Sequence, residues 1–243
     1  TQGLRKGEIM ALLEVEKLHR SFGGLAALSD VSFKVETGQI KAVIGPNGAG
    51  KTTLFNVITG MYAPTQGAIR FEGVSIAGKA PFQIARRGVA RTFQNLNLFN
   101  NMTALENVMV GRHCRTRAGI LAGALRLPSQ RAEERDIRGR ALALLETLGL
   151  ADRAAEPVGA LSFGQRRMVE LARSLATEPQ MLLLDEPASG LNPRETDDLA
   201  ATIRGIREGG VTILLVEHDM SLVMDIADDI LVLHYGRPIG EGS

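Results

Sequence analysis

Gly45-Pro46-Asn47-Gly48-Ala49-Gly50-Lys51-Thr52 is the stretch that decides the fold, because it fits the phosphate-loop pattern G-x-x-x-x-G-K-[ST]. Residues 39–44 before it read as a short buried strand, and residues 53–58 after it as the first turns of a helix. A strand, a glycine loop and a helix N-terminus make a concave nest of backbone N–H groups, where the helix dipole favours polyphosphate. The alternative, a glycine turn with an incidental lysine, does not explain why a strand and a helix flank the loop.

The residues of this loop have separate expected roles. The glycines let the backbone approach the phosphates closely and reach positive φ. Lys51 is expected to reach the β- and γ-phosphates, and the Thr52 hydroxyl is expected to ligate Mg²⁺. We therefore expect the following residues to bind a nucleotide: Gly45, Pro46, Asn47, Gly48, Ala49, Gly50, Lys51, Thr52 and Thr53.

The composition is that of an ordinary globular protein of 243 residues, with 44% hydrophobic and 23% charged residues. The formal net charge is +1, from 28 basic and 27 acidic residues, which argues against a nucleic-acid partner. The single cysteine, Cys114, excludes an internal disulfide and fits a reducing compartment. Neither an 18-residue apolar run nor a signal peptide is evident, so we expect any work at a membrane to proceed through partners. Residues 1–9 read as an extension, either a cloning remnant or the tail of a longer fused chain, and the domain is expected to begin at Met10.

Three short segments predict an antiparallel β layer beside the loop. Residues 12–18 alternate apolar and polar, residues 31–35 and 68–71 read as further strands, and glycines and prolines separate them. Phe22 lies between the first two strands. An exposed aromatic ring there would stack on a nucleotide base, although by residue type alone a core phenylalanine is the more common case.

The middle of the chain, between Gln94 and Leu161, reads as mostly helical. Thr103 predicts a helix start with Glu106 at the capping-box position, and residues 131–148 repeat apolar residues at the helical period up to Gly149. The basic stretch 112–126 has an apolar centre that would touch a membrane or partner; a solvated helix pair is the more ordinary interpretation. Ser162 and Gln165 form a second capping box, which makes this helix start another anion site or simply a capped helix.

The carboxylates follow a continuous apolar run, residues 181–184, which is typical of a central parallel strand. Asp185 lies at the carboxyl end of that strand, where such sheets bind ligands, and is expected to hold Mg²⁺. Glu186 is the candidate general base for an attacking water. Residues 195–207 predict a helix, and residues 211–216 and 230–233 two strands, with His218 placed to contact a γ-phosphate.

From about residue 12 to residue 241 the chain resembles the ATP-binding-cassette (ABC) ATPases, on the phosphate loop, Gln94, the signature 161–165, Asp185-Glu186 and His218, in that order. The resemblance implies an α/β phosphate-loop core of mostly parallel sheet (residues 10–94 and 178–243), an antiparallel β subdomain, and an inserted helical subdomain (residues 95–177). It also implies ATP hydrolysis with Mg²⁺, and it assigns the remaining site residues. Phe22 would stack on adenine. Gln94 would sense Mg²⁺ and the transport partner and serve catalysis, together with Lys51, Glu186 and the switch residue His218. The signature residues would contact the ATP of an opposite subunit: Ser162, Gly164 and Gln165.

The same resemblance implies partners. Two cassettes, either two copies or this chain with a sister ATPase, would enclose two ATP molecules and drive membrane permease subunits from the cytoplasmic face of the inner membrane, with a solute-binding protein indirectly involved. Two departures stand out: Phe163 replaces the usual second-position glycine of the signature, and Asn192 replaces a frequent aspartate.

Finer features resemble one subfamily, the larger ATPase of branched-chain amino-acid importers: Arg91-Thr92-Phe93-Gln94-Asn95-Leu96, the long insert after Asn107, Gly190-Leu191-Asn192-Pro193 and Glu217-His218-Asp219-Met220. Alternatives are a lipopolysaccharide-export ATPase, a non-transport cassette switched by ATP in DNA repair or translation, and a binder with an inactive site. The first has a similar cassette, and the RTFQ stretch and the long insert favour the importer over it. The second typically has long coiled coils or two cassettes, and the third disagrees with the intact Lys51, Asp185, Glu186 and His218.

Overall fold

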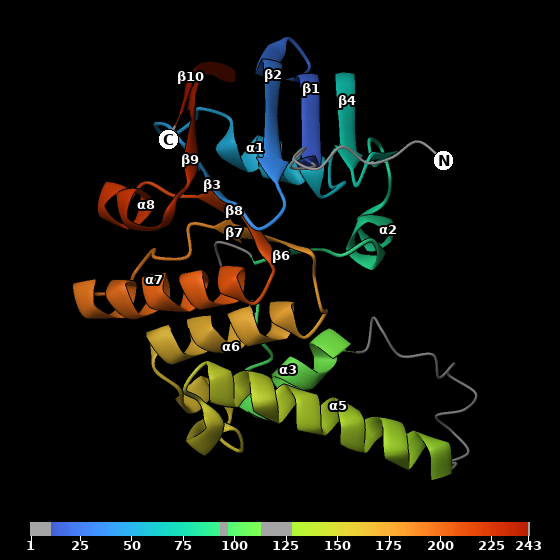
Figure 1. Ribbon diagram of the computed structural model, residues 1–243, viewed down its shortest axis with the longest axis vertical. Coiled ribbons are helices and arrows are strands. Elements are labelled where there is room, and N and C mark those ends of the chain that lie inside the picture. Colours follow the sequence, from blue (N-terminus) through green and yellow to red (C-terminus); the bar gives the residue numbers. More distant parts are fainter. Residues whose placement is uncertain (1–10, 93–96, 113–127, 243) are drawn as a thin grey trace, which may run out of the picture.

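The computed structural model describes residues 11–92, 97–112 and 128–242. The described residues form two sheets with helices between and below them (Figure 1). The four-stranded antiparallel sheet has the order β2-β1-β4-β5, and consists of β1 (Ala11–Phe22), β2 (Leu25–Glu36), β4 (Gln66–Phe71) and β5 (Val74–Ser75). The six-stranded sheet has the order β10-β9-β3-β8-β7-β6, and consists of β3 (Ile40–Ile44), β6 (Val89–Arg91), β7 (Met181–Asp185), β8 (Thr212–Val216), β9 (Asp229–His234) and β10 (Arg237–Gly242).

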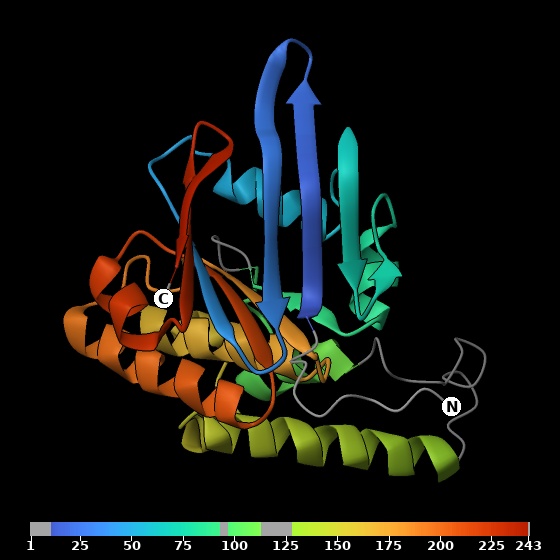
Figure 2. The same ribbon diagram turned by 45° about the horizontal axis from the view of Figure 1, so that its top comes forward.

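The antiparallel layer is confirmed, and its strands are longer than the sequence predicted. In β2 the side chains of Val31, Phe33 and Val35 are buried and the residues between them are exposed, as period-two alternation requires. In β1 a register shift between Val15 and Leu18 marks a bulge where Lys17 adopts φ 44°, and it returns Leu18 to the buried face. The long β1–β2 hairpin extends beyond the central sheet (Figure 2).

The central sheet is covered on both faces, and every residue of β7 and β8 is buried. Met181 and Leu183 point into the core shared with α1 (Lys51–Ile58) and the β layer. Leu182 and Leu184 point into a second core, which is formed with α7 (Pro193–Glu208) and α8 (Met220–Ile226). Strands β9, β3, β8, β7 and β6 are parallel, so their carboxyl ends meet at one edge.

The helical part has its own core, where α3 (Ala104–Arg112), α5 (Pro128–Thr147) and α6 (Phe163–Leu175) meet. Two 3₁₀ turns, Ala151–Arg153 and Val158–Ala160, connect α5 to α6. The capping box before α3 is confirmed: the Thr103 N–H donates to Glu106 Oε2 at 2.8 Å, and the Glu106 N–H donates to Thr103 Oγ1 at 3.1 Å. The backbone hydrogen bond from Thr103 holds the pKa of Glu106 below its ordinary value. Gly149, with φ 70°, follows the end of α5 as expected.

Several short elements were absent from the sequence prediction. They are β5, β6, α2 (Pro81–Arg86), α8 and β10. The last of these corrects the description of residues 236–243 as a polar end, because β10 pairs antiparallel with β9. Its Glu241 and Asp229 of β9 both accept from the ammonium of Lys41, a buried residue of β3. Helix α7 also begins at Pro193, capped by Asn192, two residues before the predicted start. None of the helices in the described ranges combines the length and the apolar character needed to cross a bilayer.

Candidate nucleotide-binding site

The phosphate loop connects β3 to α1, and its glycines stand where a side chain would not fit. A Cβ at Gly45 would lie 2.1 Å from the carbonyl oxygen of Leu233, and one at Gly50, with φ 103°, 2.8 Å from that of Ala27. Within the described part of the chain no side chain caps the N-terminus of α1, and its first turn has no acidic residue. The N–H groups of this turn therefore remain available to an anion.

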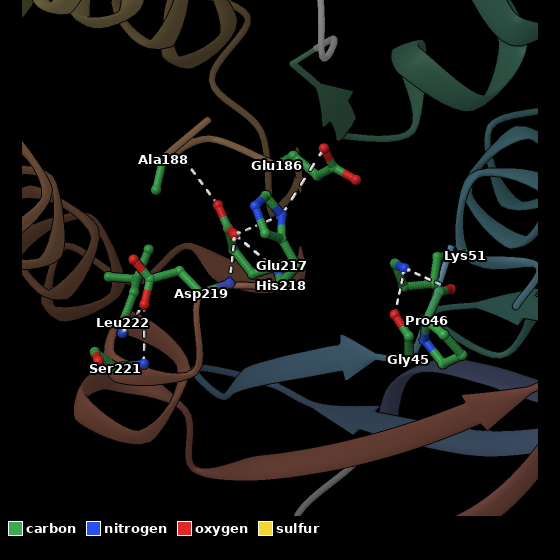
Figure 3. A network of polar contacts seen from close by, with 10 residues as sticks. All are labelled: Gly45, Pro46, Lys51, Glu186, Ala188, Glu217, His218, Asp219, Ser221 and Leu222. Carbon is green, nitrogen blue, oxygen red and sulfur yellow. Dashed lines mark hydrogen bonds and ion pairs between the residues drawn. The ribbon is translucent and has the colours of Figure 1, made fainter. Parts of the chain in front are cut away.

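Lys51 is held over the loop rather than extended into solvent. Its ammonium donates to the carbonyl oxygen of Gly45 at 2.6 Å and to that of Pro46 at 3.2 Å (Figure 3), and the residue is 6% exposed. A lysine on the inner side of a glycine loop places its positive charge where the backbone N–H groups already favour negative charge.

The pocket beside the loop has a volume of about 410 Å³. One side is polar, from Asn47 to Thr53 with the carboxylate of Glu186, and the other is mostly apolar: Phe22, Leu25, Ala26, Ala27 and Tyr235. Such a cavity offers donors to a phosphate chain at one part and apolar surface to a nucleoside at another.

Phe22 is the last residue of β1 and is partly exposed at the rim of this pocket, so the interpretation as a core residue is wrong. Its ring packs edge-on against Tyr62 with 5.1 Å between centroids, and the guanidinium of Arg20 lies 4.4 Å from its centroid. These contacts fix the ring while leaving surface for a base to stack on.

Asp185 ends β7 almost fully buried, and its carboxylate accepts from Arg91 Nη2 at 2.7 Å. The same guanidinium donates to Asn56 Oδ1 of α1 at 2.7 Å. Arg91 thus joins the segment before Gln94 to strand β7, which ends at Asp185, and to helix α1, which follows the phosphate loop. Sequence reasoning used this stretch for Gln94 and for the subfamily resemblance, and nothing in the spacing indicated that Arg91 and Asp185 would pair.

Glu186 follows Asp185 and has φ 46°, the left-handed region that non-glycine residues rarely adopt. Its N–H donates to the Val216 carbonyl at 2.9 Å, and its carboxylate faces His218, with 4.0 Å between Glu186 Oε2 and His218 Nδ1. The His218 side chain is 61% exposed. The structure therefore brings Lys51, Asp185, Glu186 and His218 to one edge of the central sheet, as predicted.

Ser162, Gly164 and Gln165 lie at the start of α6 and do not line the pocket of their own chain. The predicted capping box is present, because the Gln165 N–H donates to Ser162 Oγ at 3.3 Å and the Ser162 N–H to Gln165 Oε1 at 2.9 Å. The ring of Phe163 lies against Gly190: a Cβ added at Gly190 would be 3.1 Å from Cε1 of the ring. Gln94, Cys114 and most of the basic stretch 112–126 lie outside the described residues, and so does the extension 1–9.

A second cavity of about 490 Å³ lies between α2 and β6 on one side and α3 and α6 on the other. Its surface is mostly apolar, with Met61 and Phe99 exposed, and Arg91 and Arg173 contribute charge. Burial lowers the pKa of the Arg173 guanidinium, and nearby Glu170 partly offsets this. Arg173 Nη1 donates to the carbonyl of Asn97 at 2.6 Å. We call this cavity the apolar groove; Arg91 connects it to the carboxylate of Asp185.

Metal binding was predicted for Thr52, Gln94 and Asp185. In the described ranges no three His, Cys, Asp or Glu side chains gather into a metal cage. A site with one hydroxyl and one carboxylate suits Mg²⁺, which keeps several waters and takes further oxygens from a nucleotide. Thr52 lines the nucleotide pocket, and Asp185, whose Oδ2 accepts from Arg91, directly precedes Glu186 of that pocket, so the hydroxyl and the carboxylate are donors of the kind that suits this ion.

Comparison with known proteins identifies the family to which this nucleotide-binding site belongs. The family described as ABC transporter matches residues 28–189. The high-affinity branched-chain amino acid transport ATP-binding protein BraF of Pseudomonas aeruginosa is 49% identical over 233 residues, covering 96% of this chain and 91% of BraF. LivG of Escherichia coli K12, with the same description, is 44% identical over the same shares.

Solved structures agree. A nucleotide-free ATP-binding cassette from an ABC transporter superposes with a TM-score of 0.84 at 33% identity, covering 96% of this chain and 92% of that one. The ADP conformation of an ATP-binding cassette has the same score and identity, covering 96% and 91%. The match over most of the sequence and the shared architecture lead to one conclusion: the chain belongs to the ABC transporter family and is an ATPase of the ATP-binding-cassette type.

Proposed function

We propose that this chain is the ATP-hydrolysing subunit of an importer of branched-chain amino acids. The observation that carries the proposal is that Lys51 and Glu186 line one pocket, with Asp185 directly before Glu186 and with His218 Nδ1 4.0 Å from the Glu186 carboxylate. The identity of 44–49% to BraF and LivG over 96% of the chain supports the transported class.

The residues have distinct tasks in this proposal. Backbone N–H groups of the loop and the Lys51 ammonium bind the β- and γ-phosphates, and Phe22 stacks on the adenine. Water attacks the γ-phosphorus while Glu186 accepts a proton from it, and the bond between the γ-phosphorus and the β–γ bridging oxygen breaks. ADP leaves with the bridging oxygen, and the γ-phosphoryl group leaves as inorganic phosphate. His218 donates a hydrogen bond to the γ-phosphate. Thr52, Asp185 and Gln94 would hold Mg²⁺, which would neutralise charge on the phosphates.

Each site is completed by a second cassette, in this proposal. Ser162 and Gly164 lie away from the pocket of their own chain, at a helix start that suits an anion. Two cassettes packed head to tail would bring this helix start to the partner's γ-phosphate. The partner is a second copy or a sister ATPase.

The apolar groove is the surface we assign to a permease subunit, with a short amphipathic helix of that subunit as its occupant. The groove is continuous with the site through Arg91, which lines it and also binds Asp185. A helix bound there would contact the groove beside Arg91, whose guanidinium binds Asp185 at the end of β7, directly before Glu186. This contact would hold the cassette at the membrane surface.

We expect Met61→Asp to separate hydrolysis from coupling. Met61 is 56% exposed at the groove, so a carboxylate there has little effect on folding but places a charge against the apolar face of the docked helix. The isolated variant should hydrolyse ATP normally, and its co-purification with permease subunits should be lost. Val74→Asp, at another exposed apolar position, is the matched control. Unchanged co-purification of Met61→Asp would contradict the docking assignment.

Uptake of labelled leucine tests the proposed transport function. Cells lacking their own branched-chain importer ATPase should regain ATP-dependent leucine uptake when they express this chain together with its permease and binding-protein partners. Ribose uptake is the comparison, because a ribose import ATP-binding protein of Lacticaseibacillus paracasei is 32% identical over 94% of this chain. Restoration of ribose uptake without leucine uptake would reject the amino-acid assignment and retain the ATPase.

A further inference from the structure

Glu217 is a fully buried carboxylate next to His218, and nothing in the proposed chemistry uses it. It follows the last residue of β8 and precedes His218. Its Oε1 accepts the N–H of Ala188 at 2.8 Å, and its Oε2 accepts the N–H groups of His218 at 2.9 Å and Asp219 at 3.2 Å (Figure 3). Both oxygens are therefore engaged by backbone donors, which is how a buried carboxylate is stabilised.

These bonds extend the sheet beyond its last ladder pair. The register of β7 and β8 ends with Asp185 opposite Val216, and the Glu186 N–H donates to the Val216 carbonyl. The chain then turns away with Glu186 at φ 46°. Glu217 Oε1 supplies the next acceptor, for Ala188, in place of a backbone carbonyl. One side chain thus connects the turn after Glu186 to the loop that begins with His218.

The turn needs such support. A non-glycine residue in the left-handed region is strained and persists only where its surroundings hold it. The described bonds that hold this turn are the Ser189 N–H to the Glu186 carbonyl at 3.1 Å, the Leu191 N–H to the Ala188 carbonyl at 3.0 Å, and the bond from Ala188 to Glu217. The last of these joins the turn to the segment that carries His218, as the bond from the Glu186 N–H to the Val216 carbonyl does at the start of the turn.

We propose that Glu217 is a positioning residue, which fixes the carboxylate of Glu186 and the imidazole of His218 relative to each other and to the γ-phosphate. The proposal rests on the function proposed above. Glu217 is fully buried and is not among the residues that line the nucleotide pocket. Its effect is on geometry, and a displacement of about 1 Å in a catalytic group costs up to ~10²-fold in rate.

Glu217→Gln is the sharpest test, because it keeps the shape of the side chain and changes one acceptor into a donor. The amide nitrogen would face either Ala188 N–H or the N–H groups of His218 and Asp219, and one side of the connection would be lost. We expect kcat for ATP to fall about 10–100-fold and KM to stay within about threefold, since the phosphate loop is untouched. Binding of a fluorescent ADP analogue, measured without turnover, should be unchanged.

Asp229→Asn is the matched control. It makes the same carboxylate-to-amide change at an ion pair with the buried Lys41, on a strand of the same sheet and outside the pocket. We expect it to lower the thermal midpoint at least as much as Glu217→Gln and to leave kcat unchanged. A merely structural role for Glu217 would make the two variants behave alike.

Glu217→Ser covers the case in which the glutamine variant fails to fold. A serine hydroxyl can accept the Asp219 N–H, two residues on, so it keeps that bond before α8 and removes the bonds to Ala188 and to the His218 N–H. We expect its kcat to fall as well. A folded variant of either kind with kcat within about twofold of the original chain, or with the loss in KM instead of kcat, would overturn the proposal. Failure of the proposed function itself has a different signature, which is the absence of ATP hydrolysis by the unaltered chain and its partners.

Discussion

Glu186→Gln is expected to reduce ATP turnover by about 10²–10⁴-fold and to leave ATP binding intact. The amide has the shape of the carboxylate but cannot accept the proton of the attacking water. Because Glu186 lines the nucleotide pocket without contacting Lys51 in the described bonds, the phosphate loop keeps its geometry. Phosphate release and equilibrium binding of ATP, measured on the same preparation, separate the two effects.

The same variant should accumulate a dimer in ATP, since the closed state forms and hydrolysis no longer opens it. Size-exclusion chromatography with and without ATP detects this. Adding Ser162→Glu to the variant is the control, because a carboxylate at the start of α6 would repel the partner's γ-phosphate and should prevent the dimer. Normal hydrolysis by Glu186→Gln would show that another group is the base.

Lys51→Ala is expected to weaken nucleotide binding by about 10–100-fold, the usual loss when a charge-assisted bond to phosphate is removed. The ammonium lies within the loop, so the effect should be specific for the phosphates, and adenosine binding should not change. Isothermal titration with ADP and ATP measures it. Lys34→Ala, at an exposed lysine of β2, removes a positive charge outside the pocket and should leave the affinity unaltered. Equal affinity of Lys51→Ala and the original chain would reject the phosphate-loop assignment.

The central features of this protein were predictable because each depends on local sequence. The phosphate loop is a strand, a set of glycines and a helix start within 20 residues of chain, and the continuous apolar run before Asp185 is typical of a strand buried on both faces. The capping boxes at Thr103 and Ser162 were also found, since their partners are three residues apart.

The features that the sequence did not reveal depend on pairs far apart in the chain. Arg91 and Asp185 are 94 positions apart, and Glu217 and Ala188 are 29 apart, so no spacing indicated that they would meet. Short elements such as β6 and α8 fall below the length at which periodicity can be recognised. The exposure of Phe22 was likewise decided by the hairpin on which it lies, not by its residue type.

Strand β10 was not predicted because Gly, Pro and Glu are poor strand formers. It is nevertheless held by the buried ammonium of Lys41, which donates to Glu241. A cation in the interior tolerates the loss of a counter-ion poorly. Strand β10 therefore supplies a counter-ion to the sheet interior. Its Glu241 helps to neutralise the ammonium of Lys41, which lies four residues before Gly45 in the sequence. Shortening the protein at this end, which looks harmless in the sequence, would remove one of the two carboxylates that neutralise the buried ammonium of Lys41 and is expected to destabilise this edge of the central sheet.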